Sequence, residues 1–158
     1  MTQHQSRPAP AEALTPAQRA TLAAALNQIV PARDALPGAG DLGVAAAIER
    51  TLAGAPALLR LFLDGLRAID LAAGDAAFAD LPGGRQEALL RDVEAAQPAF
   101  FAALVEHTYR GYYTLPAVQR GLGLSGEPPQ PRGHRLAPFD PALLAVQRQR
   151  APFWRQTE

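Results

Sequence analysis

Proline residues divide this chain into short segments, most of which carry apolar residues at helical spacing. Pro16, Pro56, Pro98 and Pro141 each stand where such a segment begins. A proline fits the first turn of a helix because the N–H that it lacks would have no partner there. No segment alternates apolar and polar residues as a half-buried strand would. The sequence therefore predicts an all-α fold, a single-domain bundle of five to six helices with a proline-rich C-terminal extension.

The first two predicted helices have recognisable start signals. Thr15 can cap a helix that begins at Pro16, and Gln18 completes a capping box three residues later. This helix should end before Pro31, because a proline cannot continue the hydrogen-bonding pattern. A loop then leads to Asp41, which we expect to cap the second helix. The apolar face of that helix is formed by Val44, Ile48 and Leu52.

The remaining segments predict four further helices. One starts at Pro56 and is apolar on most sides, so we expect it to pack centrally against several neighbours. Another covers residues 85–96. A fifth starts at Pro98, with an expected inner face of Phe101, Leu104, Val105, Thr108 and Tyr112. A short sixth helix starts at Asp140 and Pro141 and continues through Val146.

The chain length and the distribution of these segments predict the domain organisation. The 158 residues suit one ordinary domain with its own core. Residues 1–13 are polar and rich in Pro and Ala, and we expect a disordered arm there. Residues 14–136 should form the helical domain. Residues 137–158 should form a C-terminal extension that contains the short helix.

The charged residues and the missing residue types exclude several functions. The chain has 15 cationic and 15 acidic residues and a net charge of zero, whereas a nucleic-acid-binding protein normally carries a basic excess. All the cationic residues are Arg, which excludes lysine-based phosphate loops and Schiff-base chemistry. The absence of Cys excludes disulfides, thiolate metal sites, iron–sulfur clusters and covalently attached haem c.

The N-terminal residues and the hydropathy pattern bear on location. The first fourteen residues contain neither a twin arginine nor an apolar core, so they carry no recognisable export signal. No run approaches the roughly 18 apolar residues that a membrane span requires. We therefore expect a cytoplasmic protein without direct membrane insertion.

One sequence motif and the three histidines offer only weak indications of chemistry. Residues 38–43 match the G-x-G-x-x-G dinucleotide fingerprint, but no strand is predicted before them, and that context is essential to the motif. His4, His107 and His134 are scattered, and Glu106 should pair with Arg110 four residues on. No carboxylate pair or serine suggests an activated group. We predict no catalytic, cofactor-binding or metal-binding residue.

Three tyrosines and a proline-rich segment form the strongest candidate site. Tyr109, Tyr112 and Tyr113 cannot all share one helix face, because adjacent residues diverge by about 100°. At least one should point outward, where tyrosine is a favoured interface residue, although all three could instead cover the core. The predicted partner-binding residues are these tyrosines together with Pro128, Pro129, Pro131, Arg132 and Trp154.

Three stretches of sequence resemble the gluconate 2-dehydrogenase subunit 3 family. They are LTPAQRATL at residues 14–22, PGAGDLGVAAAIE at residues 37–49, and GYYTLPAVQRGLG followed by PPQPRGH between residues 111 and 134. The resemblance implies a small helical subunit beside a flavin-dependent dehydrogenase of the glucose–methanol–choline type. It also implies that FAD lies in that large subunit and that haem c, where present, lies in a third, cytochrome c subunit.

The resemblance thus implies a non-catalytic accessory subunit that binds a dehydrogenase and stabilises or matures it. Members of the family usually carry a twin-arginine signal. This chain would reach a periplasmic, membrane-associated complex only if it were exported together with its partner. The alternative is a free-standing helical binding protein or oligomer without a dehydrogenase partner.

Overall fold

The computed structural model describes residues 13–125 and 138–150, and every regular element in them is helical. The chain divides into two units, residues 1–126 and 127–158. The helices of the first unit are α1 (Pro16–Ile29), α2 (Val44–Ala53), α3 (Pro56–Ala73), α4 (Gly83–Ala96), α5 (Pro98–Tyr113) and α6 (Pro116–Gly121). Two short 3-10 helices, η1 (Ala39–Leu42) and η2 (Phe78–Asp80), lie between them. The predicted all-α fold is confirmed.

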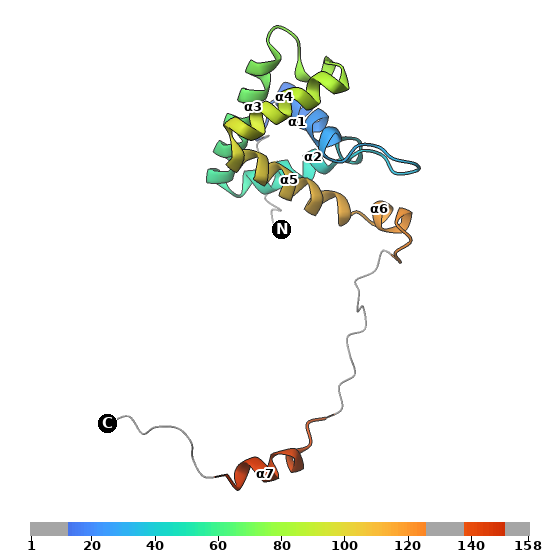
Figure 1. Cartoon of the computed structure of the whole chain (residues 1–158), viewed down its shortest axis with the longest axis vertical. Helices are drawn as coiled ribbons and strands as arrows, with labels where there is room; N and C mark the ends of the chain where they lie inside the picture. Colours follow the sequence, from blue (N-terminus) through green and yellow to red (C-terminus); the bar gives the residue numbers. More distant parts are fainter. Residues whose placement is uncertain (1–12, 126–137, 151–158) are drawn as a thin grey trace, which may run out of the picture. The chain divides into compact units, whose positions relative to one another are not determined.

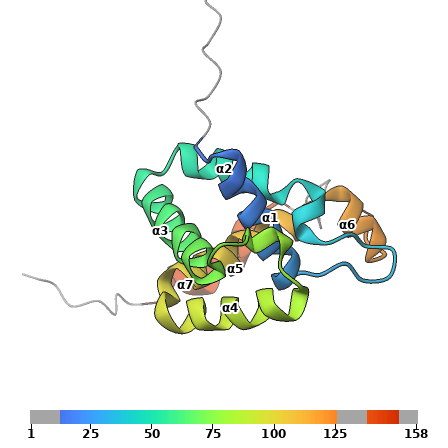
Figure 2. The ribbon, with the colours of Figure 1, turned by 90° about the horizontal axis from the view of Figure 1, so that it is seen from above.

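Helix α1 contacts most of the other elements of the first unit. It packs against α2, α3, α4, α5 and both 3-10 helices, and α2 and α4 lie on opposite sides of it (Figure 2). Leu22, Ala25 and Leu26 of α1 are completely buried. Helix α3 also contacts four helices, as its apolar composition predicted. Helix α6 continues the chain beyond the C-terminal end of α5 (Figure 1).

The centre of the core is formed by aromatic rings from α3 and α5. Phe62 and Phe100 are both completely buried and meet edge to face, with their ring centroids 5.5 Å apart. Gly65 lies under Phe100, so that a Cβ atom at position 65 would come within 2.2 Å of a ring carbon. The missing side chain therefore allows α3 and α5 to approach each other closely.

The start of α1 has the predicted capping box and is also tied to α2. Thr15 Oγ1 accepts a hydrogen bond from the Gln18 N–H, and the Thr15 N–H donates to Gln18 Oε1. Glu49 of α2 binds the Arg19 guanidinium at 2.8 Å and accepts a hydrogen bond from the Leu14 N–H at 3.0 Å. The bond from Arg19 holds the pKa of the Glu49 carboxyl below its usual value.

The predicted start of the second helix is wrong. Asp41 belongs to η1, and the residue that precedes α2 is Gly43, with a positive φ of 74°. The start of α2 differs from the prediction because a side chain of α1 binds this segment. Asn27 Oδ1 accepts the Gly40 N–H at 2.7 Å, and Asn27 Nδ2 donates to Asp41 Oδ1 at 3.1 Å. These two hydrogen bonds hold η1 against α1. The Asp41 carboxylate accepts one of them and does not cap α2.

The structure also explains the glycines in residues 38–43. Gly40 packs against the backbone of α1, where a Cβ atom would lie 2.1 Å from the Ala23 carbonyl oxygen. The preceding element is helix α1, and no strand adjoins the segment within the described residues. Gly38 and Gly40 therefore serve close packing against α1, whereas Gly43 supplies the positive φ before α2. The helical surroundings lack the strand that a dinucleotide fingerprint requires.

The predicted inner face of α5 is partly wrong. Its fully buried residues are Phe100, Leu104, Thr108 and Tyr112. Phe101 and Val105 were assigned to the same face but are only half-buried. Each lies one position after a buried residue and is thus rotated by about 100° around the helix. Phe100 takes the central position because Gly65 leaves room for its ring.

The described part of the second unit is a short helical segment. Asp140 Oδ1 accepts a hydrogen bond from the Ala142 N–H at 2.9 Å, and the 3-10 helix η3 (Pro141–Leu144) leads into α7 (Ala145–Arg148). The predicted short helix is confirmed, although its first turn is a 3-10 helix. Every described residue of this unit is exposed. The predicted disordered arm lies outside the described residues except for residue 13.

Candidate interaction surface

One side of α5 carries an apolar and aromatic row that the rest of the domain covers only in part. We call it the outer stripe: Phe101, Val105, Tyr109 and Tyr113, each four residues after the last. This spacing places all four side chains along one side of the helix. Phe101 and Val105 are half-buried, whereas Tyr109 and Tyr113 are 47% and 48% exposed. The two tyrosine rings are in contact, with centroids 5.9 Å apart.

A groove runs beside the outer stripe. One hollow, with a volume of about 280 Å³, lies between α5, α4 and the end of α1 and has Ile29, Leu90, Phe101, Val105 and Tyr109 in its lining. A second hollow is lined by Phe101 and Val105 as well, so the two adjoin. Acidic side chains predominate among the charged residues that line them: Glu87, Glu94 and Glu106 against Arg91. The groove is therefore apolar in its floor and mainly acidic at its edges.

Tyr112 occupies a different position from its two neighbours. Its side chain is only 3% exposed, and its hydroxyl donates to the Pro37 carbonyl oxygen at 2.9 Å. It also meets the Tyr113 ring edge to face, with centroids 5.2 Å apart. Burial raises the pKa of the Tyr112 hydroxyl. The Tyr112 hydroxyl thus connects the loop after α1 to α5, whereas Tyr109 and Tyr113 are exposed on the outer stripe.

Two further large hydrophobic residues are exposed near the end of the described part of the first unit. Leu122 and Leu124 are 51% and 59% exposed. Helix α6 lies against the loop after α1, where a Cβ atom at Gly121 would come within 2.4 Å of the Leu36 side chain. Large, exposed hydrophobic residues in the described part of the first unit are Leu71, Tyr109, Tyr113, Leu122 and Leu124. All but Leu71 fall within residues 109–124.

The structure therefore separates the residues predicted to bind a partner. Tyr109 and Tyr113 lie on the outer stripe and Tyr112 lies in the core. Pro128, Pro129, Pro131, Arg132 and Trp154 lie outside the described residues. Sequence reasoning missed Phe101 and Val105 as members of the surface. Their spacing of eight and four residues before Tyr109 was the available signal, but both residues were assigned to the inner face.

The described residues were also compared with the requirements of a metal site and of a membrane span. No three His, Asp or Glu side chains within residues 13–125 and 138–150 could hold a metal ion together. Glu106 and Arg110 form the predicted ion pair at 3.1 Å. No helix of the described segments is both long and apolar enough to cross a membrane.

These features define a small all-helical domain with an apolar groove and an exposed aromatic stripe. A family model described as gluconate 2-dehydrogenase subunit 3 matches residues 16–124. The chain belongs to this family, as its sequence resemblance predicted. The match ends at the exposed Leu124, one residue before the end of the described part of the first unit. No curated protein and no solved structure matches the chain.

Proposed function

We propose that this chain is a non-catalytic accessory subunit that binds and stabilises the catalytic subunit of a flavin-dependent sugar or alcohol dehydrogenase. The family description names a dehydrogenase subunit. The observation that carries the proposal is the outer stripe, where two half-exposed tyrosines adjoin an apolar groove. Tyrosine offers a large apolar contact area and a hydroxyl at modest entropic cost, which favours it at protein interfaces.

The physical role would be stabilisation by mass action. A subunit that binds only the folded form of its partner raises the partner's unfolding free energy by RT ln(1 + [L]/Kd), which is about 2.7 kcal/mol at a hundredfold excess over Kd. This role needs a complementary surface and no reactive group. FAD would belong to the large subunit, and haem c to a third subunit where one exists. A complex formed before export could take this chain to the periplasm with the partner.

Affinity capture tests the proposal. The full chain, tagged at its N-terminus, is expressed in its native host and recovered with its bound proteins, which are identified by mass spectrometry. Recovery of a flavoprotein dehydrogenase, with flavin absorbance in the purified complex, is the expected result. Recovery of the chain alone, as a monomer or as an oligomer of itself, would instead favour a free-standing helical protein and contradict the proposal.

A further inference from the structure

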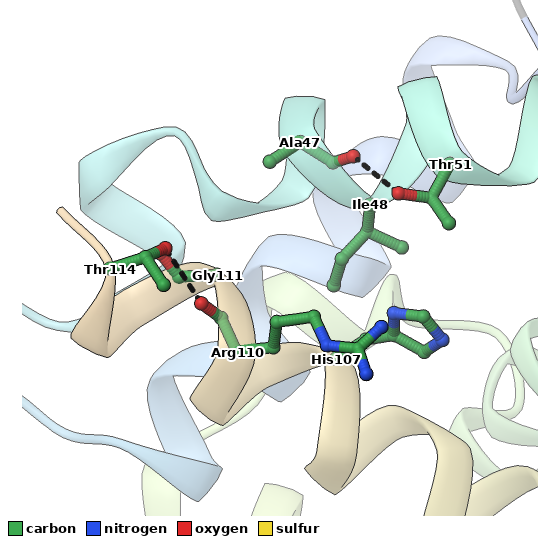
Figure 3. A pocket seen from close by; sticks show the side chains of 7 residues that line it. All are labelled: Ala47, Ile48, Thr51, His107, Arg110, Gly111 and Thr114. Atoms are coloured by element: carbon green, nitrogen blue, oxygen red, sulfur yellow. Dashed lines mark hydrogen bonds between the residues drawn. The ribbon is translucent and has the colours of Figure 1, made fainter. Parts of the chain in front are cut away.

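A second pocket, which the proposed function does not use, lies between α2 and α5. Its volume is about 180 Å³ (Figure 3), and its lining residues are Ala47, Ile48 and Thr51 from α2 and His107, Arg110, Gly111 and Thr114 from the end of α5. His107 and Tyr109 are about 200° apart around the helix. The pocket therefore lies on the other side of α5 from the outer stripe.

His107 lines this pocket, and its imidazole has no hydrogen-bonding partner among the described residues. Its ring packs edge-on against the buried Phe62, with centroids 6.0 Å apart. No described residue forms a hydrogen bond or ion pair with the imidazole, yet neither of its nitrogens is both buried and unpaired. The imidazole nitrogens are therefore accessible, and a neutral or charged imidazole has at least one N–H to donate. The ring contact limits the directions in which it can donate.

Arg110 adds a cationic donor one turn further along α5. One of its terminal nitrogens pairs with Glu106 Oε1 at 3.1 Å, in a contact between two well-exposed side chains. A guanidinium has five N–H donors in a planar fork, so this contact leaves several of them unused. Glu106 is not among the residues that line the pocket, and none of those residues is acidic.

The hydroxyl of Thr114 hydrogen-bonds to carbonyl oxygens at the end of α5 that would otherwise repel an anion. The Thr114 hydroxyl donates to the carbonyl oxygens of Arg110 at 2.7 Å and Gly111 at 3.2 Å. The Thr51 hydroxyl donates to the Ala47 carbonyl oxygen at 3.2 Å (Figure 3). Carbonyl groups near the C-terminal end of a helix carry partial negative charge, and the hydrogen bonds from Thr114 neutralise part of it at the end of α5.

We propose that this pocket binds a carboxylate group on a short aliphatic stem. The Arg110 fork matches the planar geometry of a carboxylate, and His107 supplies a further donor. Ile48 and Ala47 form an apolar wall that suits a carbon stem. A phosphate is a poorer fit, because phosphate sites typically use backbone N–H groups at a helix N-terminus. Here the wall is formed by the C-terminal half of α5.

Acetate titration of the isotope-labelled full chain tests the site by NMR. Sodium acetate replaces sodium chloride at constant ionic strength. We expect saturable shifts, in the millimolar range, of the His107 ring, the Arg110 Nε–H and the amides of residues 47–51 and 107–114. Arg110→Gln and His107→Gln should each weaken binding about tenfold, because each removes a donor to a charged group. Arg110→Lys keeps the charge but loses the fork, and should also weaken binding.

The matched control is Arg91→Gln. Arg91 is equally exposed and pairs with Glu87 four residues earlier, at 2.6 Å, but no histidine shares its pocket. Acetate binding should be unchanged in this variant. Shifts that rise linearly with acetate in the wild-type chain, or equal affinities in the wild type and both Arg110 variants, would overturn the proposal. Melting curves identify any variant that has lost its fold.

The same variants identify the source of the carboxylate. If an acidic side chain of a protein partner fills the pocket, Arg110→Gln will reduce recovery of that partner in affinity capture. Arg67→Gln, at an exposed position of α3 that lines neither this pocket nor the groove, will not. If a free small carboxylate fills it, capture will be unchanged and only the titration will respond. The site does not depend on the proposed function, because acetate binding can be observed even if no dehydrogenase is recovered.

Discussion

The Phe100 ring lies directly on the bare Cα of Gly65, and this contact sets how closely α5 approaches α3. A Cβ atom at position 65 would lie 2.2 Å from the ring, well inside the distance at which carbon atoms can pack. Phe100 is completely buried and also touches Phe62, so its ring has little space into which it could move. The pair therefore determines which residues of α5 point inward.

Gly65→Ala should destabilise the protein even though alanine is the better helix former. Overpacking typically lowers the free energy of unfolding by about 1–3 kcal/mol, and the higher helix propensity of alanine offsets about 1 kcal/mol of this loss. We expect a net loss of about 1–2 kcal/mol in the free energy of unfolding by urea titration. Gly84→Ala is the control, because a Cβ atom there meets nothing within 4 Å. Equal stabilities of the two variants would contradict this packing.

Tyr112→Phe should cost more stability than Tyr113→Phe. The first change removes the hydrogen bond to the Pro37 carbonyl oxygen, which joins the loop after α1 to α5. The expected loss is about 1 kcal/mol. The Tyr113 ring is 48% exposed and its hydroxyl has no hydrogen-bonding partner among the described residues, so its replacement should be nearly neutral. The thermal unfolding of both variants tests this order. A larger loss of stability in Tyr113→Phe than in Tyr112→Phe would contradict the role given to the Tyr112 hydroxyl.

Glu49 should make stability depend on pH in the acid range. Because Arg19 lowers the pKa of this carboxyl in the folded chain, the carboxylate stabilises the fold above its ordinary pKa of 4.5. That contribution is lost as the pH falls through the lowered folded value. Glu49→Gln should cost about 1–2 kcal/mol at pH 7 and less in acid, as measured by denaturant unfolding at several pH values.

Glu87→Gln provides the comparison for Glu49. Its carboxylate forms only an exposed pair with Arg91, and such pairs contribute little. The unfolding free energy of this variant at pH 7 should stay within about 0.5 kcal/mol of the wild type. If Glu49→Gln behaves in the same way, the link between α1 and α2 contributes no measurable stability.

Replacement of both outer tyrosines should weaken partner binding with little effect on folding. Tyr109→Ala/Tyr113→Ala removes the two exposed aromatic rings of the outer stripe, and tyrosines that are interface hot spots contribute tenfold or more to affinity. We expect recovery of the dehydrogenase to fall at least about tenfold in quantitative affinity capture. Leu71→Ala, on α3 and 70% exposed, should leave recovery unchanged. Undiminished recovery with the tyrosine variant would exclude this surface from the interface.

The helix starts show what local sequence determines. Thr15 and Gln18 form the predicted capping box, because both partners lie within one turn of each other. Asp140, where the sixth helix was predicted to start, likewise accepts the Ala142 N–H. Asp41 had the same local signal, but the Asn27 side chain from α1 binds it and moves the start of α2 to Val44. A capping residue is predictable only where no distant side chain competes for it.

Helix α5 shows the same limit for the candidate surface. Its sequence contains two apolar rows with four-residue spacing, one from Phe100 to Tyr112 and one from Phe101 to Tyr113. The periodicity showed that the three tyrosines cannot all lie on one face of α5. It did not show which of the two rows is buried. Gly65 accepts Phe100, and the Pro37 carbonyl accepts the Tyr112 hydroxyl, so the first row is buried.

The sequence by itself determined the helical class, most of the helix boundaries and the family. These depend on proline positions, capping residues and spacings that act within a few residues of the chain. Only the tertiary structure decided that Tyr109 and Tyr113 face outward beside the groove, and that His107 and Arg110 share a pocket with α2. Those outcomes depend on contacts between residues far apart in the chain, where the fit of one side chain against another sets the rotation of each helix.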